Sequence, residues 1–238
     1  MKIWLDIIVV AIIAVAVWSG YKKGVIMGIG GIIVLIIAVV VGNALSNAYS
    51  QEVVTAMRPF ASGYTDKLLG ESVYAELGIA DSEYSIEDLL KQKPELNLSA
   101  AKRAMLSLGL SEDAAEVVAM DAVKYTNENG ITLSEGLTET VCSKTAFAVG
   151  FLLFFLLTAI ILTVIGNISN LSYRIPYIGI GNEIGGALCG IAEGLILCMV
   201  LAWALRFMGI VFPDGLLEET LLVEKLMDKN LIAAYLGI

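Results

Sequence analysis

The sequence predicts an all-α, polytopic membrane protein with four transmembrane helices and a helical extramembrane insert between helices 2 and 3. The first observation is composition: 58% of the 238 residues are hydrophobic and only 16% are charged, whereas about 25% of the residues of an ordinary soluble domain are charged. The hydrophobic residues gather into long runs. A helix of 21 residues, the length of the second run, reaches about 31 Å, which matches the hydrocarbon thickness of a bilayer. The runs cover residues 3–19, 25–45, 146–165 and 184–207.

The second observation is a ladder of glycines in the fourth run. Gly186, Gly190 and Gly194 are spaced four apart, so they lie on one face of a helix. Glycine costs about 1 kcal/mol relative to alanine inside an exposed helix, and in a bilayer the compensating advantage is the close approach of a second helix. We therefore assign a helix-packing role to a set of glycines. They are Gly24, Gly28, Gly181, Gly185, Gly186, Gly190 and Gly194.

The apolar runs divide the chain into four parts. A short polar turn, Tyr21-Lys22-Lys23, joins the first two runs. This suits a helical hairpin better than a cleaved signal peptide, although Ala14-Val15-Ala16 resembles a cleavage site. The predicted parts are a transmembrane hairpin over residues 1–45, an acidic helical extracytoplasmic insert over 46–145, a second transmembrane hairpin over 146–208 and an extracytoplasmic amphipathic tail over 209–238.

The cationic residues predict the orientation. Lys22 and Lys23 lie in the first short loop and Arg174 in the second, whereas residues 46–144 carry eight Lys or Arg against 16 Asp or Glu. Because short cytoplasmic loops are rich in Lys and Arg, we place both short loops in the cytoplasm and the insert and tail outside. The expected partner is the lipid bilayer, which the chain crosses several times.

Helix start and stop signals organise the insert and the tail. The segments Ser85-Ile86-Glu87-Asp88 and Thr132-Leu133-Ser134-Glu135 match capping boxes, and the helix after the second should continue into the third apolar run. Pro94 ends one helix, and Ser111 is a candidate cap for the next. Apolar residues of the tail recur at helical spacing over residues 216–234. We expect that helix to pack on the insert or, as the alternative, to lie among the lipid headgroups.

The chain offers little for catalysis. It contains no His, and His is the usual general base and a common zinc ligand. Gly179-Ile180-Gly181 begins a dinucleotide-binding fingerprint, but Ile184 replaces its third glycine and no strand precedes it. Cys142, Cys189 and Cys198 form no disulfide framework, and a net charge of −9 argues against a nucleic-acid partner. We therefore expect no enzymatic activity, no metal and no cofactor.

Two acidic residues within the apolar runs are candidate functional residues. Asp6 lies near the end of the first run, where we expect it to be solvated among headgroups or paired with Lys2. Glu193 lies deeper, beside the glycine face, and a carboxyl group inside a membrane is costly. It is either a proton or cation relay, a substrate contact, or a structural interhelical hydrogen bond, and we favour the hydrogen bond. Asn182 and Glu183 are expected to be the N-cap and first-turn acid of the fourth helix.

Three short motifs together resemble the colicin V production protein (CvpA) family. They are Trp4-Leu5-Asp6, then Gly20-Tyr21-Lys22-Lys23-Gly24, and then Asn182-Glu183-Ile184-Gly185-Gly186 followed by Gly190 and Gly194. The chain departs from the family in its long insert and in having Glu193 where Lys or Arg usually stands between the last two glycines.

The resemblance implies a bacterial inner-membrane protein of four helices. Its role would be non-enzymatic and accessory to toxin production or export, or to envelope maintenance. The alternative is a small-solute or ion transporter or channel that uses Glu193. In either case the expected partners are further copies of the chain or other membrane and envelope proteins.

Overall fold

The computed structural model of the protein describes residues 3–78, 85–110, 112–168, 179–207, 222, 225–226 and 230–236. Every regular element in these ranges is an α-helix, which confirms the all-α prediction. The helices are α1 (Ile3–Leu77), α2 (Ile86–Gln92), α3 (Leu96–Ser107), α4 (Glu112–Asn129), α5 (Leu133–Ile168), α6 (Gly179–Phe207) and α8 (Leu231–Leu236).

The chain forms two compact units, and each is described by itself. The first unit comprises Met1–Ser46, Val149–Leu205 and Gly215–Gly237. The second unit comprises Asn47–Ala148, Arg206–Asp214 and Ile238. Helix α1 contributes residues to both units, and so does α5.

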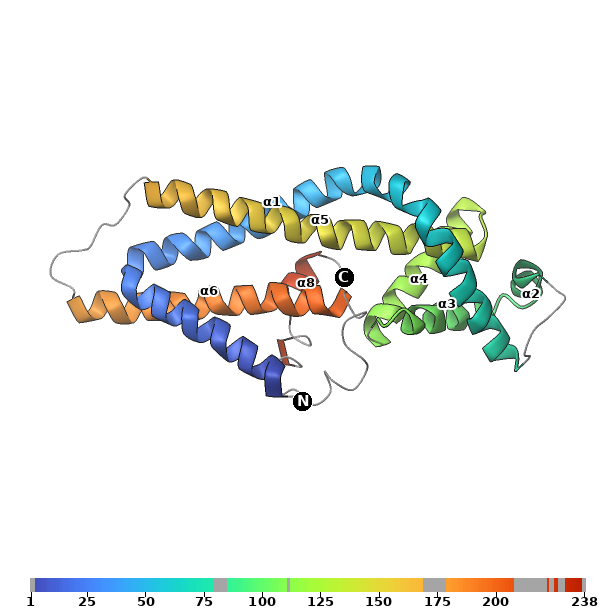
Figure 1. Cartoon of the computed structure of the whole chain (residues 1–238), viewed down its shortest axis with the longest axis horizontal. Helices are drawn as coiled ribbons and strands as arrows, with labels where there is room; N and C mark the ends of the chain where they lie inside the picture. The colour runs from blue at the N-terminus through green and yellow to red at the C-terminus, as the bar shows by residue number, and fades with distance from the viewer. Residues whose placement is uncertain are drawn as a thin grey trace. The chain divides into compact units, whose positions relative to one another are not determined.

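Helix α1 contains both of the first two apolar runs and is interrupted at Gly24. This residue has a φ of 78° and a ψ of 178°, a conformation that residues with a side chain rarely adopt. The blue part of α1 in Figure 1 accordingly bends sharply. The predicted polar turn at residues 21–23 is therefore helical, and the chain reverses at the glycine that follows it. We call residues 3–23 the first arm of α1 and residues 25–46 its second arm.

Three helices are long and apolar enough to cross a membrane. They are Leu5–Leu77 within α1, Leu133–Gly166 within α5 and Ile180–Leu205 within α6. The sequence predicts four crossings. The number of helices differs because the backbone stays helical on both sides of Gly24, so the first two predicted spans belong to one element.

Aromatic side chains fill the space between α5 and α6 in the first unit. Phe151, Phe155 and Trp203 are fully buried. The rings of Phe151 and Trp203 meet edge to face with their centroids 4.8 Å apart, which is a favoured arrangement of aromatic pairs. A Cβ atom at Gly42 would lie 3.2 Å from the main-chain N of Phe155. The second arm of α1 therefore runs close against the backbone of α5.

The second unit has a hydrophobic core of its own, in which six of the 14 buried members are alanines. Short side chains let helices approach closely, and the alanines of α3 and α4 are almost completely buried. Larger residues from α1 and α5 close the core around them. The buried members are Leu68, Leu69, Val73, Leu90, Ala100, Ala101, Ala104, Met105, Ala115, Val118, Ala119, Ala122, Leu133 and Leu137.

The helix boundaries of the second unit follow the sequence signals. The Thr132–Glu135 capping box is confirmed: the Thr132 N–H donates to Glu135 Oε2 at 3.0 Å, and the Glu135 N–H donates to Thr132 Oγ1 at 3.2 Å. As predicted, α5 then continues for 36 residues into the third apolar run. Ser85 precedes α2, but its side chain makes no capping hydrogen bond. The candidate cap Ser111 lies outside the described residues.

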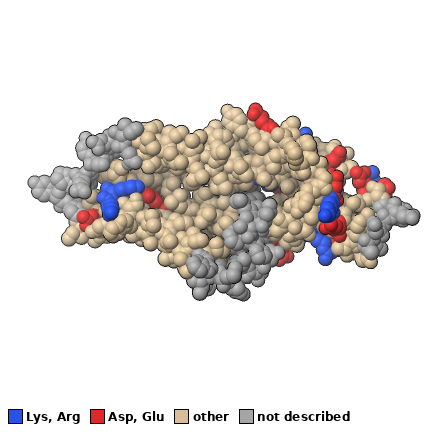
Figure 2. All heavy atoms as spheres, viewed as in Figure 1, with Lys and Arg blue, Asp and Glu red and all other residues tan. Residues whose placement is uncertain are grey.

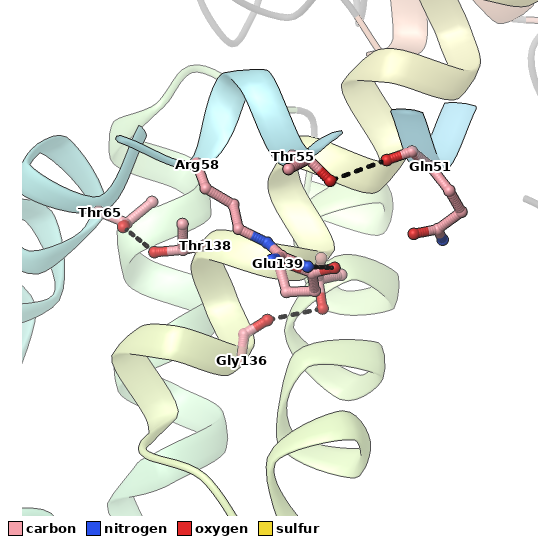
Figure 3. A network of polar contacts seen from close by, with 8 residues as sticks. Gln51, Thr55, Arg58, Thr65, Gly136, Thr138 and Glu139 are labelled. Carbon is pink, nitrogen blue, oxygen red and sulfur yellow. Dashed lines mark hydrogen bonds and ion pairs between the residues drawn. The ribbon is translucent and has the colours of Figure 1, made fainter. Parts of the chain in front are cut away.

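Polar contacts hold α1 against α5 in the second unit, and Figure 3 shows them from close by. Arg58 donates to Glu139 through Nε at 2.5 Å and through Nη2 at 2.9 Å, and such two-point contacts fix geometry as well as charge. The hydroxyl groups of Thr65 and Thr138 lie 2.5 Å apart and are buried. These contacts orient the part of α1 that follows the second arm.

The described part of the tail lies in the first unit rather than on the predicted insert. Asn230 donates to the Met199 carbonyl of α6 at 2.8 Å, and its Oδ1 accepts from the N–H groups of Ile232 and Ala233 at the start of α8. Leu226 packs against the Val9–Cys198 cluster. One buried amide therefore caps α8 and ties it to α6, which is why the expectation that the tail packs on the insert was wrong for these residues.

Candidate functional site at the contact of α1 and α6

The glycine face of α6 lies against the backbone of the first arm of α1. A Cβ atom at Gly186 would collide with the carbonyl oxygen of Gly20, and one at Gly190 would lie 2.8 Å from Cα of Val17. A Cβ atom at Gly194 would lie 3.1 Å from Cα of Ile13. The chain number rises along α6 as it falls along the arm, so the two segments are antiparallel.

The second arm of α1 meets a neighbouring strip of α6. A Cβ atom at Gly28 would lie 2.5 Å from Cβ of Cys189, and one at Gly185 would collide with the side chain of Val25. Gly181 is exposed. Figure 1 shows the result: α6 runs between the two arms as they diverge from the bend.

Polar side chains support the bend at Gly24. Oδ1 of Asn182 accepts the main-chain N–H of Val25 at 2.9 Å, so it caps the first residue of the second arm. Glu183 Oε2 accepts the Tyr21 hydroxyl at 2.7 Å. We expected Asn182 and Glu183 to be the N-cap and first-turn acid of their own helix. That assignment was wrong, because α6 already begins at Gly179 and both side chains turn toward α1.

Asp6 joins the start of α1 to the tail. Its Oδ1 accepts the main-chain N–H of Leu222 at 3.1 Å. Lys2, the partner that we considered for Asp6, lies outside the described residues. This hydrogen bond is exposed, and it links the start of α1 to the tail.

Glu193 lies directly on the main chain of Gly31 in the second arm. A Cβ atom at Gly31 would lie 2.6 Å from Cδ of Glu193 and would collide with its Oε1. Oε1 itself is buried and has no hydrogen-bond partner among the described residues. The interhelical hydrogen bond that we favoured for Glu193 is therefore not formed by this oxygen within the described part of the chain.

The sequence analysis assigned a packing role to Gly24 and Gly28 but not to Gly20 and Gly31. Gly20, Gly24 and Gly28 are also spaced four apart, and each of them lies against a residue of α6. Gly31 follows Gly28 by three residues on the second arm, so these two lie on nearly the same face. The spacing of four from Gly24 pointed to Gly20, and the spacing of three from Gly28 pointed to Gly31.

The cysteines and the other acidic residues form no further candidate site among the described residues. Cys142 and Cys198 are buried and Cys189 is partly buried, and all are free thiols. Within the described ranges, no three His, Cys, Asp or Glu side chains are grouped so that they could hold a metal ion.

The second unit contains an open pocket of about 440 Å³ between α1, α2 and the start of α5, lined in part by Asp66, Lys91 and Asn97.

Comparison with known proteins gives a family match. The family model described as Colicin V production protein matches residues 118–231. The match contains the glycine ladder of α6, Asn182 and Glu193, whereas the motifs of the first arm of α1 lie before it. No curated protein and no solved structure matches the chain significantly. Over residues 118–231 the chain therefore matches the colicin V production protein (CvpA) family, as its motifs predicted.

Proposed function

We propose that this chain is a multi-pass protein of the bacterial cytoplasmic membrane in which both arms of α1, α5 and α6 each cross the bilayer. Apolar side chains that face away from the protein support this. Only 17% of the most apolar stretch of α5 is buried. Its exposed large side chains are Val149, Leu153, Leu156, Leu157, Ile160, Ile161, Val164 and Ile165. So large an apolar surface is rare on a soluble monomer and is normal for a helix in lipid.

The charged residues support the same placement. On the face shown in Figure 2, the apolar helices of the first unit present a surface that is free of charge over most of its length. Lys22 and Lys23 lie beside the Gly24 break, and Lys22 stacks over the Trp18 ring at 4.8 Å, as amphipathic groups do at a membrane surface. We place this break in the cytoplasm, and the insert and the tail outside.

The role that we propose is non-enzymatic and accessory to toxin production or export, or to envelope maintenance. The observation that carries it is the family match over residues 118–231. The lack of His in the sequence supports a role in binding and assembly rather than in general acid–base catalysis. The second unit, with its own core, is the part that we expect to meet other envelope proteins or further copies of the chain.

The orientation predicts opposite labelling of two engineered cysteines in a variant whose native cysteines are replaced by Ala. Glu112→Cys lies in the second unit, where the Glu112 side chain is 79% exposed, and should react with a membrane-impermeant thiol reagent in intact spheroplasts. Lys22→Cys, beside the break, should react only after lysis. The reverse pattern would invert the proposed topology, and labelling of both sites in intact spheroplasts would contradict it.

A second candidate function is transport of a small solute or ion through Glu193. The observation that favours it is the buried Oε1 without a partner among the described residues, because a polar group at this depth is commonly functional. The accessory role requires only that the side chain of residue 193 occupy the space beside Gly31. The two functions therefore differ in whether a neutral side chain of the same shape is sufficient.

Glu193→Gln separates these functions by complementation of a strain that lacks the gene, tested under envelope stress. We expect the Gln variant to complement at normal membrane abundance, because the amide has the shape of the protonated acid. Glu193→Leu, which keeps neither polar atom, serves as the packing control and should reduce abundance slightly. A Gln variant that is abundant but fails to complement would replace the accessory role by transport.

A further inference from the structure

The contact of Glu193 with Gly31 has the features of a binding site for a single proton. Seven residues separate Gly31 from the break at Gly24, so the carboxyl group lies about 10 Å along the second arm. That arm carries no charged residue between positions 25 and 45. An ionised carboxylate within an apolar membrane-spanning segment is energetically costly. The neutral acid avoids that cost.

The charged neighbours of Glu193 lie toward one end of the site. Lys23, the last residue of the first arm, acts on Glu193 electrostatically. No ion pair joins the two among the described residues, and the apolar run of α5 over residues 146–165 is uncharged. Cys189 precedes Glu193 by one turn of α6 and packs on Gly28. Within the described part of the chain, the cation that acts on Glu193 thus lies on the side of the break.

Gly31 makes the room for the carboxyl group. A Cβ atom there would meet the Glu193 Oε1 and Cδ atoms and no main-chain atom among its nearest neighbours. The end of a flexible side chain can move aside, so a residue larger than glycine would displace the carboxyl group without separating the two helices. This distinguishes Gly31 from Gly190, whose neighbours are backbone atoms.

We propose that Glu193, seated on Gly31, is a reversible proton-binding site that holds its proton at neutral pH and exchanges it with the side of the membrane on which the Gly24 break lies. The site binds a proton whether the chain is an accessory protein or a transporter. Its failure in the experiment below would leave the proposed function untouched, because the measurement uses purified protein and no cellular phenotype.

The first test is the infrared absorption of protonated carboxyl groups, recorded against pH on the purified full chain in lipid nanodiscs. Wild-type protein should show a protonated-acid band at neutral pH that disappears only at alkaline pH. Glu193→Gln should lack this band, and Glu183→Gln, which removes an acid bonded to Tyr21 at the break, should retain it. A neutral-pH band that survives in Glu193→Gln, or no band in the wild type, would overturn the proposal.

The second test uses a hydrophobic carbodiimide, which adds to a protonated carboxyl group so that the acid proton passes to a nitrogen of the reagent. Mass spectrometry should find the adduct on residue 193. Well above the midpoint of the titration, labelling should fall about tenfold per pH unit, as the protonated fraction does. Gly31→Ala should move this midpoint to lower pH by displacing the carboxyl group. Absence of the adduct, or an unchanged midpoint in Gly31→Ala, would contradict the site.

Discussion

Gly190→Leu is expected to remove most of the folded protein from the membrane. The new side chain would begin against the carbonyl oxygen of Ala16 and the Cα of Val17, and these main-chain atoms cannot adopt another rotamer. Overpacking of this kind costs about 1–3 kcal/mol or more, and in lipid no hydrophobic force restores the contact of the separated helices. For a chain of 238 residues we expect the thermal midpoint in detergent to fall by about 2–12 °C.

The matched control is Gly30→Leu in the second arm of α1. Gly30 is exposed, and a Cβ atom there would have no neighbour within 4 Å. The same change should therefore leave stability unchanged or raise it by up to about 1 kcal/mol through helix propensity. Thermal unfolding followed by fluorescence size-exclusion compares the two variants directly. If both variants melt together, the glycine face of α6 does not pack against the first arm.

Gly24→Ala is expected to destabilise the bundle by a different mechanism. The φ of 78° and ψ of 178° at this residue cost about 1–3 kcal/mol for a residue with a side chain. The added Cβ atom would also lie 2.7 Å from Oδ1 of Asn182, the atom that accepts the Val25 N–H. The variant should lose both the bend and its cap, and limited proteolysis of the purified protein should cut near residue 24.

Two further variants separate these causes. Gly63→Ala changes a glycine of the same helix that has no neighbour within 4 Å of a Cβ atom, so it should be neutral or mildly stabilising. Asn182→Ala keeps Gly24 and removes only the hydrogen bond to Val25, at an expected cost of about 1 kcal/mol. Proteolysis of Asn182→Ala as strong as that of Gly24→Ala would show that the cap, and not the backbone strain, controls the bend.

Glu193 illustrates how far the sequence alone could go in predicting the candidate site. Its position in an apolar run whose other charged residue is Arg206, beside glycines spaced four apart, was enough to single it out. Whether its carboxyl group had a partner depended on residues about 160 positions away in the chain, and Gly31 carries no side chain that a pattern could detect. The same limit applies to Asn182, whose type predicts a helix cap but not which helix it caps.

Local signals in the sequence determined the elements. The length and the uncharged character of the apolar runs, the Thr132–Glu135 capping box and the glycine spacing act over a few residues, so they predicted an all-α chain, the start of α5 and the helix face that Gly186, Gly190 and Gly194 share. Such signals are readable because each helix forms most of its hydrogen bonds within itself.

Only the tertiary structure decided how those elements meet. It showed that a single glycine replaces the predicted turn, that α6 lies between two arms of one helix, and that Asn230 ties the described tail residues to α6. Each of these depends on shape complementarity between backbones distant in sequence. A glycine can pack against many different helices, and an amide can form hydrogen bonds with many different groups. The packing of the whole chain decides which of these contacts forms.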